Sequence, residues 1–162
     1  TDEAVSILPI SKYRDWIGKE FSIHGSISIK ETNHDLTLLL GKTYDEFLDE
    51  LPATWNSEIK HHNSDLFGFG GFKNMGEFLH LLNGTINYVI LRNFENFPQV
   101  FSSTNHNDID ILTDDLIILP YVLMTQGNES PKGKIPSAIK IGNDTIPIDW
   151  KRPGDVYYDK NW

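Results

Sequence analysis

Residues 107–112 read Asn-Asp-Ile-Asp-Ile-Leu, with apolar and acidic side chains in alternation. In a β-strand, successive side chains point to opposite faces. Ile109 and Ile111 are therefore expected to enter a core, while Asp108 and Asp110 share the other face. Two carboxylates this close repel each other, and a bound divalent cation offsets the repulsion. Because aspartate is also depleted in strands, the pattern favours a metal-binding strand over the alternative, a half-exposed strand with solvated acids.

The composition indicates a globular protein, since 39% of the 162 residues are hydrophobic and 12% are aromatic. This length is enough for a single domain with a substantial core. The formal net charge of −9 argues against nonspecific binding to nucleic acid or to an anionic membrane, because both require a basic face. It is compatible with a phosphorylated substrate held through metal ions.

The chain contains no cysteine, which excludes disulfides and thiolate zinc sites. This is mildly in favour of a reducing compartment, so we expect a cytoplasmic location. No run of about 18 apolar residues is present, so no membrane span is predicted. The chain begins without Met and ends at Trp162, and we expect it to be a domain excised from a longer protein, with further domains of that protein as partners.

A hairpin and two helices are predicted ahead of the acidic region. Helical spacing of apolar residues predicts a short helix that ends near Gly18. Alternation over 21–29 predicts a strand, and the apolar run 36–40 predicts a second strand that pairs with it. A capping box at Thr43–Glu46 predicts a helix that Pro52 ends.

The second half of the chain alternates predicted helices and strands. In order, these are a capped helix at 74–84, a strand at 88–91, the acidic strand, a helix at 115–124 that Pro120 kinks or starts, and a hairpin of strands at 135–141 and 145–150. Such a pattern predicts an α+β fold with a mixed sheet.

A third acid, Asp149, lies on the last of these strands. If this strand neighbours the acidic strand in one sheet, Asp149 lies beside Asp108 and Asp110. Three carboxylates can hold two Mg²⁺ or Mn²⁺ ions that clamp a phosphoryl group and activate an attacking oxygen. Arg92, at the end of the strand at 88–91, can supply a cation near the leaving group. The alternatives are that Asp149 is an ordinary strand-end acid and that Arg92 pairs with a surface acid.

This order of elements resembles the DNA polymerase β-type nucleotidyltransferase superfamily. Within it, the segment Leu91–Glu95 followed by 107–112 is similar to a group found in polysaccharide and cell-surface glycan biosynthesis proteins. The closing segment 154–159, Gly-Asp-Val-Tyr-Tyr-Asp, is also similar to that group. The resemblance spans roughly residues 75–160.

The resemblance implies a mixed β-sheet flanked by helices, with residues 75–162 as a nucleotidyltransferase-like core. It does not extend to residues 1–74, which we expect to form an N-terminal hairpin and helix extension of the same domain. It implies that Asp108, Asp110 and Asp149 are catalytic residues that bind Mg²⁺ or Mn²⁺. The implied reaction moves a nucleotidyl or related phosphate-linked group from a phosphorylated or nucleotide donor to a glycan-type acceptor.

The chain departs from the superfamily pattern at the end of the predicted strand at 88–91, which precedes the acidic strand. Members usually have Gly-Ser or Gly-Gly there, where backbone and hydroxyl groups hold a triphosphate, whereas this chain has Arg92-Asn93. The departure argues against an ordinary nucleoside triphosphate donor, and favours another phosphorylated donor or a lost activity. Arg92, Asn93 and His106 are the candidate substrate-binding residues, although His106 could simply shape the turn.

Two other function classes stay open at this point. A sugar-nucleotide glycosyltransferase also uses an Asp-x-Asp metal motif, but its first half is usually a run of βα units that bind the nucleotide. A noncatalytic module would keep the fold and bind a partner or a glycan through aromatic loops. The Gly- and Phe-rich run at 67–72 could cradle a phosphate, but no P-loop Lys-Ser/Thr follows it. It is therefore predicted to be a loop packed by its own aromatic side chains.

Overall fold

The computed structural model describes residues 3–18, 23–52, 54, 56–63, 66–92, 94, 97, 108–116, 119–123 and 138–154. Their helices and strands confirm the α+β class. In chain order they are α1 (Glu3–Ile17), α2 (Ile29–Leu40), α3 (Tyr44–Glu50), α4 (Met75–Thr85), β1 (Tyr88–Ile90), β2 (Ile109–Thr113), α5 (Leu119–Leu123), β3 (Ala138–Ile141) and β4 (Asp144–Lys151).

The four strands form one mixed sheet in the order β1-β2-β4-β3. β1 runs antiparallel to β2, and β3 runs antiparallel to β4, while β2 and β4 are parallel neighbours. A two-residue turn joins β3 to β4, and Gly142 adopts a φ of 60° in it, which glycine reaches without steric cost. The strand predictions in the second half of the chain are therefore confirmed, with slightly different bounds.

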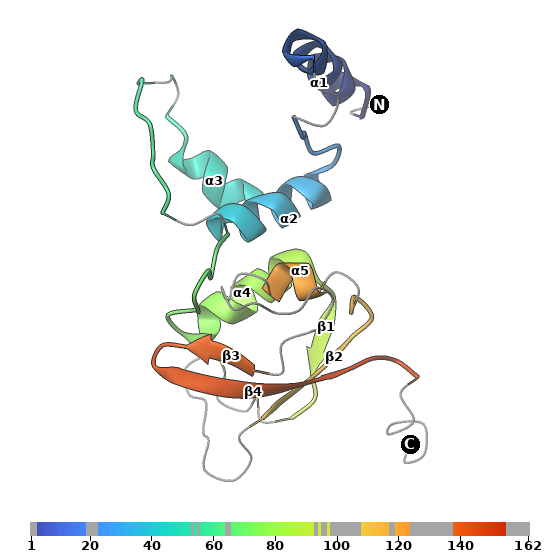
Figure 1. Cartoon of the computed structure of the whole chain (residues 1–162), viewed down its shortest axis with the longest axis vertical. Helices are drawn as coiled ribbons and strands as arrows, with labels where there is room; N and C mark the ends of the chain where they lie inside the picture. The colour runs from blue at the N-terminus through green and yellow to red at the C-terminus, as the bar shows by residue number, and fades with distance from the viewer. Residues whose placement is uncertain are drawn as a thin grey trace.

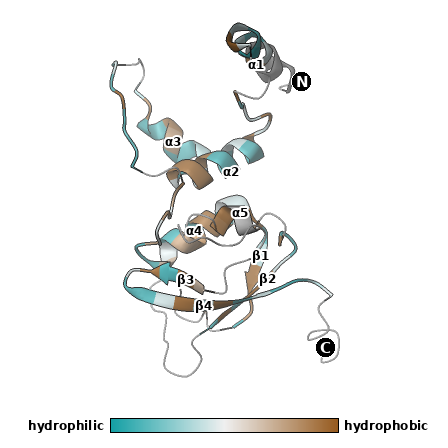
Figure 2. Cartoon of the chain, viewed as in Figure 1, coloured by the Kyte–Doolittle hydropathy of each residue, from teal (hydrophilic) through white to brown (hydrophobic). Residues whose placement is uncertain are grey.

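Helices α4 and α5 cover one face of this sheet (Figure 1). The core between them consists of apolar side chains from the loop before α4, from both helices and from three strands: Phe72, Met75, Phe78, Leu81, Leu82, Ile86, Ile109, Ile111, Leu119, Val122, Leu123, Ile139, Ile141, Ile146 and Ile148. Figure 2 shows hydrophobic segments on α4 and on the sheet, and hydrophilic residues along α3. As expected, Ile109 and Ile111 point into the core.

Helix α2 lies on the side of α4 that faces away from the sheet (Figure 1). Gly84 permits this close approach, because a Cβ at that position would lie 2.4 Å from Thr37 Oγ1 and 2.6 Å from Thr37 Cγ2. Thr37 is itself buried. Gly84 was expected to end α4, but the helix continues to Thr85.

The predicted N-terminal hairpin is wrong. Residues 23–26 form no strand pairing, and the apolar run 36–40 belongs to helix α2. Caps at both ends decide this. Ser28 Oγ accepts the Glu31 N–H at 3.1 Å as the N-cap, and Glu31 Oε2 accepts the N–H of Ile27, the residue before the cap, at 2.6 Å. Gly41 ends the helix in the left-handed conformation.

The remaining helix predictions are confirmed. α1 ends at Ile17 with Gly18 at a φ of 68°. α3 begins at the predicted capping box, with Thr43 and Glu46 bonded reciprocally. α5 begins at Leu119, so Pro120 lies in its first turn, where a missing N–H is tolerated. No helix within the described ranges is both long enough and apolar enough to cross a membrane.

Candidate functional site: an acidic sheet face with paired cations

The acidic strand and the strand of the third acid are neighbours in the sheet. In the parallel pairing of β2 with β4, Asp110 is directly opposite Asp149. Directly opposed residues in a ladder point to the same face. That face is the one opposite the core, because the adjacent Ile109 and Ile148 are buried under the helices. Asp108 is half-buried and directly precedes the same strand, two residues before Asp110. We call this surface the acidic face.

Arg92 is brought to the acidic face by the end of β1. The Leu91 N–H donates to the Asp110 carbonyl at 2.9 Å, which continues the β1–β2 pairing by one residue. The chain then bends, and Arg92 Nε donates to Asp110 Oδ2 at 2.6 Å, with Nη2 at 2.5 Å from the same oxygen. Asp110 is 2% exposed. The expectation that Arg92 reaches this region is met, and the partner it finds there is the buried carboxylate of Asp110.

A second cation, Lys151, forms an ion pair with Asp149 Oδ2. The two residues are separated by one position on β4, so their side chains project from the same face. Sequence reasoning missed Lys151. The rule that placed Asp108 and Asp110 on one face, a separation of two positions on a strand, also places Lys151 beside Asp149. The acidic face therefore combines three carboxylates with two cations.

These ion pairs decide the present geometry of the carboxylates. The oxygens of Asp108, Asp110 and Asp149 do not all lie within 4.8 Å of one another, the separation at which three ligands could share one ion. The cations offset the repulsion that was expected to require a metal. Carboxylate oxygens are nevertheless the ligands that Mg²⁺ and Mn²⁺ prefer. Such an ion would have to displace the guanidinium and the ammonium, which would then be free to contact phosphate oxygens.

Several predicted residues cannot be placed in this site. Asn93 and His106 lie outside the described residues, as does the closing segment 155–159. Asp115 lies after β2, and its Oδ2 accepts the N–H of Asn87, the residue before β1, at 3.0 Å.

Comparisons of the chain with protein-family models, with curated proteins and with solved structures give no match.

Proposed function

We propose that the chain is a metal-dependent transferase of the nucleotidyltransferase type that moves a nucleotidyl or related phosphate-linked group in glycan or polysaccharide biosynthesis. The supporting observation is the parallel register of β2 and β4, which sets Asp110 opposite Asp149 on one face. The resemblance of the motifs to glycan biosynthesis proteins supports the choice of acceptor.

In this proposal Asp108, Asp110 and Asp149 are the metal ligands. Bound Mg²⁺ or Mn²⁺ supplies charge neutralisation at the phosphoryl group and activation of the attacking oxygen. The residues of the chain position the donor. Arg92 and Lys151 exchange their carboxylate partners for donor phosphate oxygens, with Arg92 well suited because its guanidinium can bind two oxygens at once. Phosphoryl transfer requires little beyond such positioning and charge stabilisation.

The donor is expected to differ from an ordinary nucleoside triphosphate. The Gly-Ser turn that cradles a triphosphate is replaced by Arg92-Asn93, and Arg92 is directed at a carboxylate. A donor with fewer phosphates, such as a nucleoside diphosphate-linked group, needs fewer backbone and hydroxyl contacts than a triphosphate does. Arg92 and Lys151 can match its negative charge.

A noncatalytic module is the second candidate, and the two ion pairs favour it. Arg92 and Lys151 neutralise carboxylates that an enzyme would offer to metal, so the acidic face could be a purely structural arrangement. A sugar-nucleotide glycosyltransferase has less support. Among the described residues from 23 to 87, the strand-like pairing is a single isolated bridge between Phe72 and Ile141, whereas that class needs βα units in its first half.

The deciding experiment is calorimetric titration of Mn²⁺ and Mg²⁺ into the wild-type chain and into Asp108→Asn and Asp149→Asn. Each titration is repeated with a panel of nucleoside triphosphates, nucleoside diphosphate sugars and other phosphorylated donors. We expect binding that both variants lose and that one donor class tightens. Asp114→Asn, an exposed acid just after β2, is the matched control and should bind like wild type. Absence of binding in the wild type, or unchanged binding in Asp108→Asn, would establish the noncatalytic candidate.

A further inference from the structure

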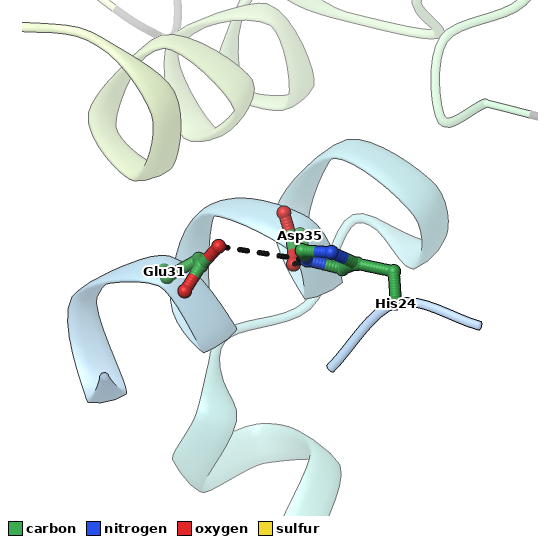
Figure 3. Close-up of side chains that lie close together, drawn as sticks. All are labelled: His24, Glu31 and Asp35. Atoms are coloured by element: carbon green, nitrogen blue, oxygen red, sulfur yellow. Dashed lines mark hydrogen bonds and ion pairs between the residues drawn. The ribbon is translucent and has the colours of Figure 1, made fainter. Parts of the chain in front are cut away.

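Three potential metal ligands meet at the start of α2, away from the acidic face. His24 Nε2 lies 3.1 Å from Asp35 Oδ2 and 3.5 Å from Glu31 Oε1. One atom of each of the three side chains lies within 4.8 Å of the other two. Figure 3 shows Glu31 and Asp35 projecting from one side of the helix toward His24, which comes from the segment before it. We call this group the His24 cluster.

Local structure explains why these side chains converge. Glu31 and Asp35 are four residues apart on α2, so their side chains are neighbours on one helix face. The helix begins at its Ser28 cap, and the preceding segment passes alongside that face. Arg14 of α1 holds this segment, because its Nε and Nη2 donate to the Ile23 carbonyl at 3.1 and 2.9 Å. The ring of His24 is thereby presented to both carboxylates.

Additional hydrogen bonds orient both carboxylates. Glu31 Oε2 accepts the Ile27 N–H at 2.6 Å, which leaves Oε1 directed at His24. Asp35 Oδ1 lies 3.2 Å from His34 Nδ1, and Ser26 Oγ donates to Asp35 Oδ2 at 3.0 Å. Outer partners of this kind fix the orientation of metal ligands and raise affinity.

The distances from His24 Nε2 to the two carboxylates are close to those between the ligands of a tetrahedral ion. With zinc–nitrogen and zinc–oxygen bonds of about 2.0–2.2 Å, the ligand atoms of a tetrahedral site lie roughly 3.3–3.6 Å apart. The distances from His24 Nε2, 3.1 and 3.5 Å, lie at or near this range. An imidazole nitrogen favours zinc over magnesium, which prefers oxygen ligands in an octahedron.

We propose that His24, Glu31 and Asp35 form a zinc site. Three protein ligands leave the fourth tetrahedral position for water or for an oxygen atom of a bound molecule. Bound there, the ion would fasten the segment around His24 to α2, in place of the direct contacts of His24 with Asp35 and Glu31. This inference is independent of the transferase proposal, because the ligands, the helix and the metal all differ from those of the acidic face.

The test is calorimetric titration of Zn²⁺ into the wild-type chain and into His24→Ala and Asp35→Asn near pH 7.5, because zinc binds its ligands in their deprotonated form. One zinc ion per chain is expected to bind the wild type. Loss of an outer partner alone lowers metal affinity about 10- to 100-fold, so loss of a ligand should lower it at least tenfold. The His24 side chain is 67% exposed, and His24→Ala should therefore fold normally, as circular dichroism will show.

Two controls separate this site from other zinc-binding groups. His62→Ala removes an exposed histidine outside the cluster, and Asp114→Asn removes an exposed carboxylate outside both proposed sites; both should keep wild-type zinc affinity. X-ray absorption at the zinc edge should show one imidazole and otherwise oxygen neighbours. The proposal is overturned by a wild-type chain that does not bind zinc at micromolar concentration, by unchanged affinity in His24→Ala, or by loss of zinc in either control. Mn²⁺ binding that survives in His24→Ala would leave the transferase proposal intact.

Discussion

Asp110 is the one buried acidic or basic side chain among the residues that the structure describes. Burial of a carboxylate costs several kcal/mol unless a cation and hydrogen bonds compensate it. Arg92 supplies both, through two nitrogen atoms on one carboxylate oxygen. The pair therefore stabilises the sheet in the absence of metal, and any ion that binds the acidic face must replace what Arg92 provides.

A double-variant cycle tests this pairing. Arg92→Ala is expected to lower the free energy of unfolding by about 1–3 kcal/mol, because a buried acceptor loses its partner. Asp110→Asn also loses the ion pair, so the repulsion that it relieves does not raise stability. The double variant should lose less free energy of unfolding than the two single variants lose together. Urea unfolding should give a coupling free energy between Arg92 and Asp110 of roughly 0.5–3 kcal/mol.

The second ion pair of the same face is the control for that cycle. The Lys151 side chain is 21% exposed but that of Asp149 is 48% exposed, so water can solvate the Asp149 carboxylate once Lys151 is removed, and the pair contributes about 1 kcal/mol or less. Lys151→Ala should therefore change stability much less than Arg92→Ala does. Equal effects of the two variants, or strictly additive effects in the cycle, would contradict the structural role assigned to Arg92.

At the scale of elements, the contact of α2 with α4 depends on a missing side chain. Gly84 lies against the buried Thr37, where a methyl group has no room. Glycine lowers helix stability by about 1 kcal/mol relative to alanine, so its presence inside α4 is explained by the close approach of the two helices and not by the helix itself.

Gly84→Ala should consequently be destabilising, by about 1–3 kcal/mol, because overpacking outweighs the gain in helix propensity. Thermal or urea unfolding measures the change. Thr37→Ala removes two of the three atoms that the new methyl group meets, and combining it with Gly84→Ala should restore part of the loss. An alanine variant at least as stable as wild type would show that α2 moves away freely.

The capping box of α3 makes a pH-dependent contribution. Hydrogen bonds from the Thr43 backbone N–H and hydroxyl, at 2.7 and 2.9 Å, hold the pKa of Glu46 below its usual 4.5. Because the pKa is lower in the folded state, the unfolded chain binds more protons in acid. The contribution is therefore complete above about pH 4.5 and is lost as the pH falls through the folded pKa.

Thr43→Ala should reduce the free energy of unfolding by about 1 kcal/mol at pH 7. The difference from wild type should shrink in acid, where Glu46 is protonated in both proteins. Urea unfolding at several pH values measures this, and NMR titration should show the pKa of Glu46 rising in the variant. A pKa that does not move would mean that the Thr43 hydroxyl does not lower it and that the backbone N–H, which the variant keeps, does so alone.

At the scale of the whole molecule, the helices are stacked outward from the sheet. α4 and α5 cover the sheet, α2 and α3 lie beyond α4, and α1 stands apart at the far end from the sheet (Figure 1). Every buried core side chain belongs to residue 72 or later. The described side chains of α1, from residue 10 onward, are all exposed or half-buried, and Trp16 is 75% exposed.

Hydrogen exchange should reveal this gradient. Regions with few buried apolar contacts open locally at low free-energy cost, whereas core elements exchange only on global unfolding. Amides of residues 3–17 are therefore expected to exchange much faster than those of α4 and β2 in peptide-resolved mass spectrometry. Protection of α1 equal to that of α4 would contradict the placement of the core.

The sequence by itself determined those helices and strands that a short local pattern of residues specifies. The alternation around Asp108 and Asp110 predicted β2 and the face of its isoleucines. The turn at Gly142 predicted the β3–β4 hairpin, and the capping box at Thr43 predicted α3. The alternation of side chains specifies a strand, a two-residue turn with glycine specifies a hairpin, and a hydrogen bond between residues three apart specifies the start of a helix. None of these signals depends on distant residues.

Only the tertiary structure decided the rest, because those features depend on residues far apart in the chain. The apolar run 36–40 suits a strand or a helix by itself, and the caps at Ser28 and Gly41 together with packing against α4 make it a helix. Arg92 reaches Asp110 across 18 positions, and His24 reaches Asp35 across 11. Hydrophobic periodicity cannot reveal such pairs. Arg92 contacts Asp110 because β1 and β2 are neighbours in the sheet, and His24 contacts Asp35 because the segment before α2 passes alongside that helix.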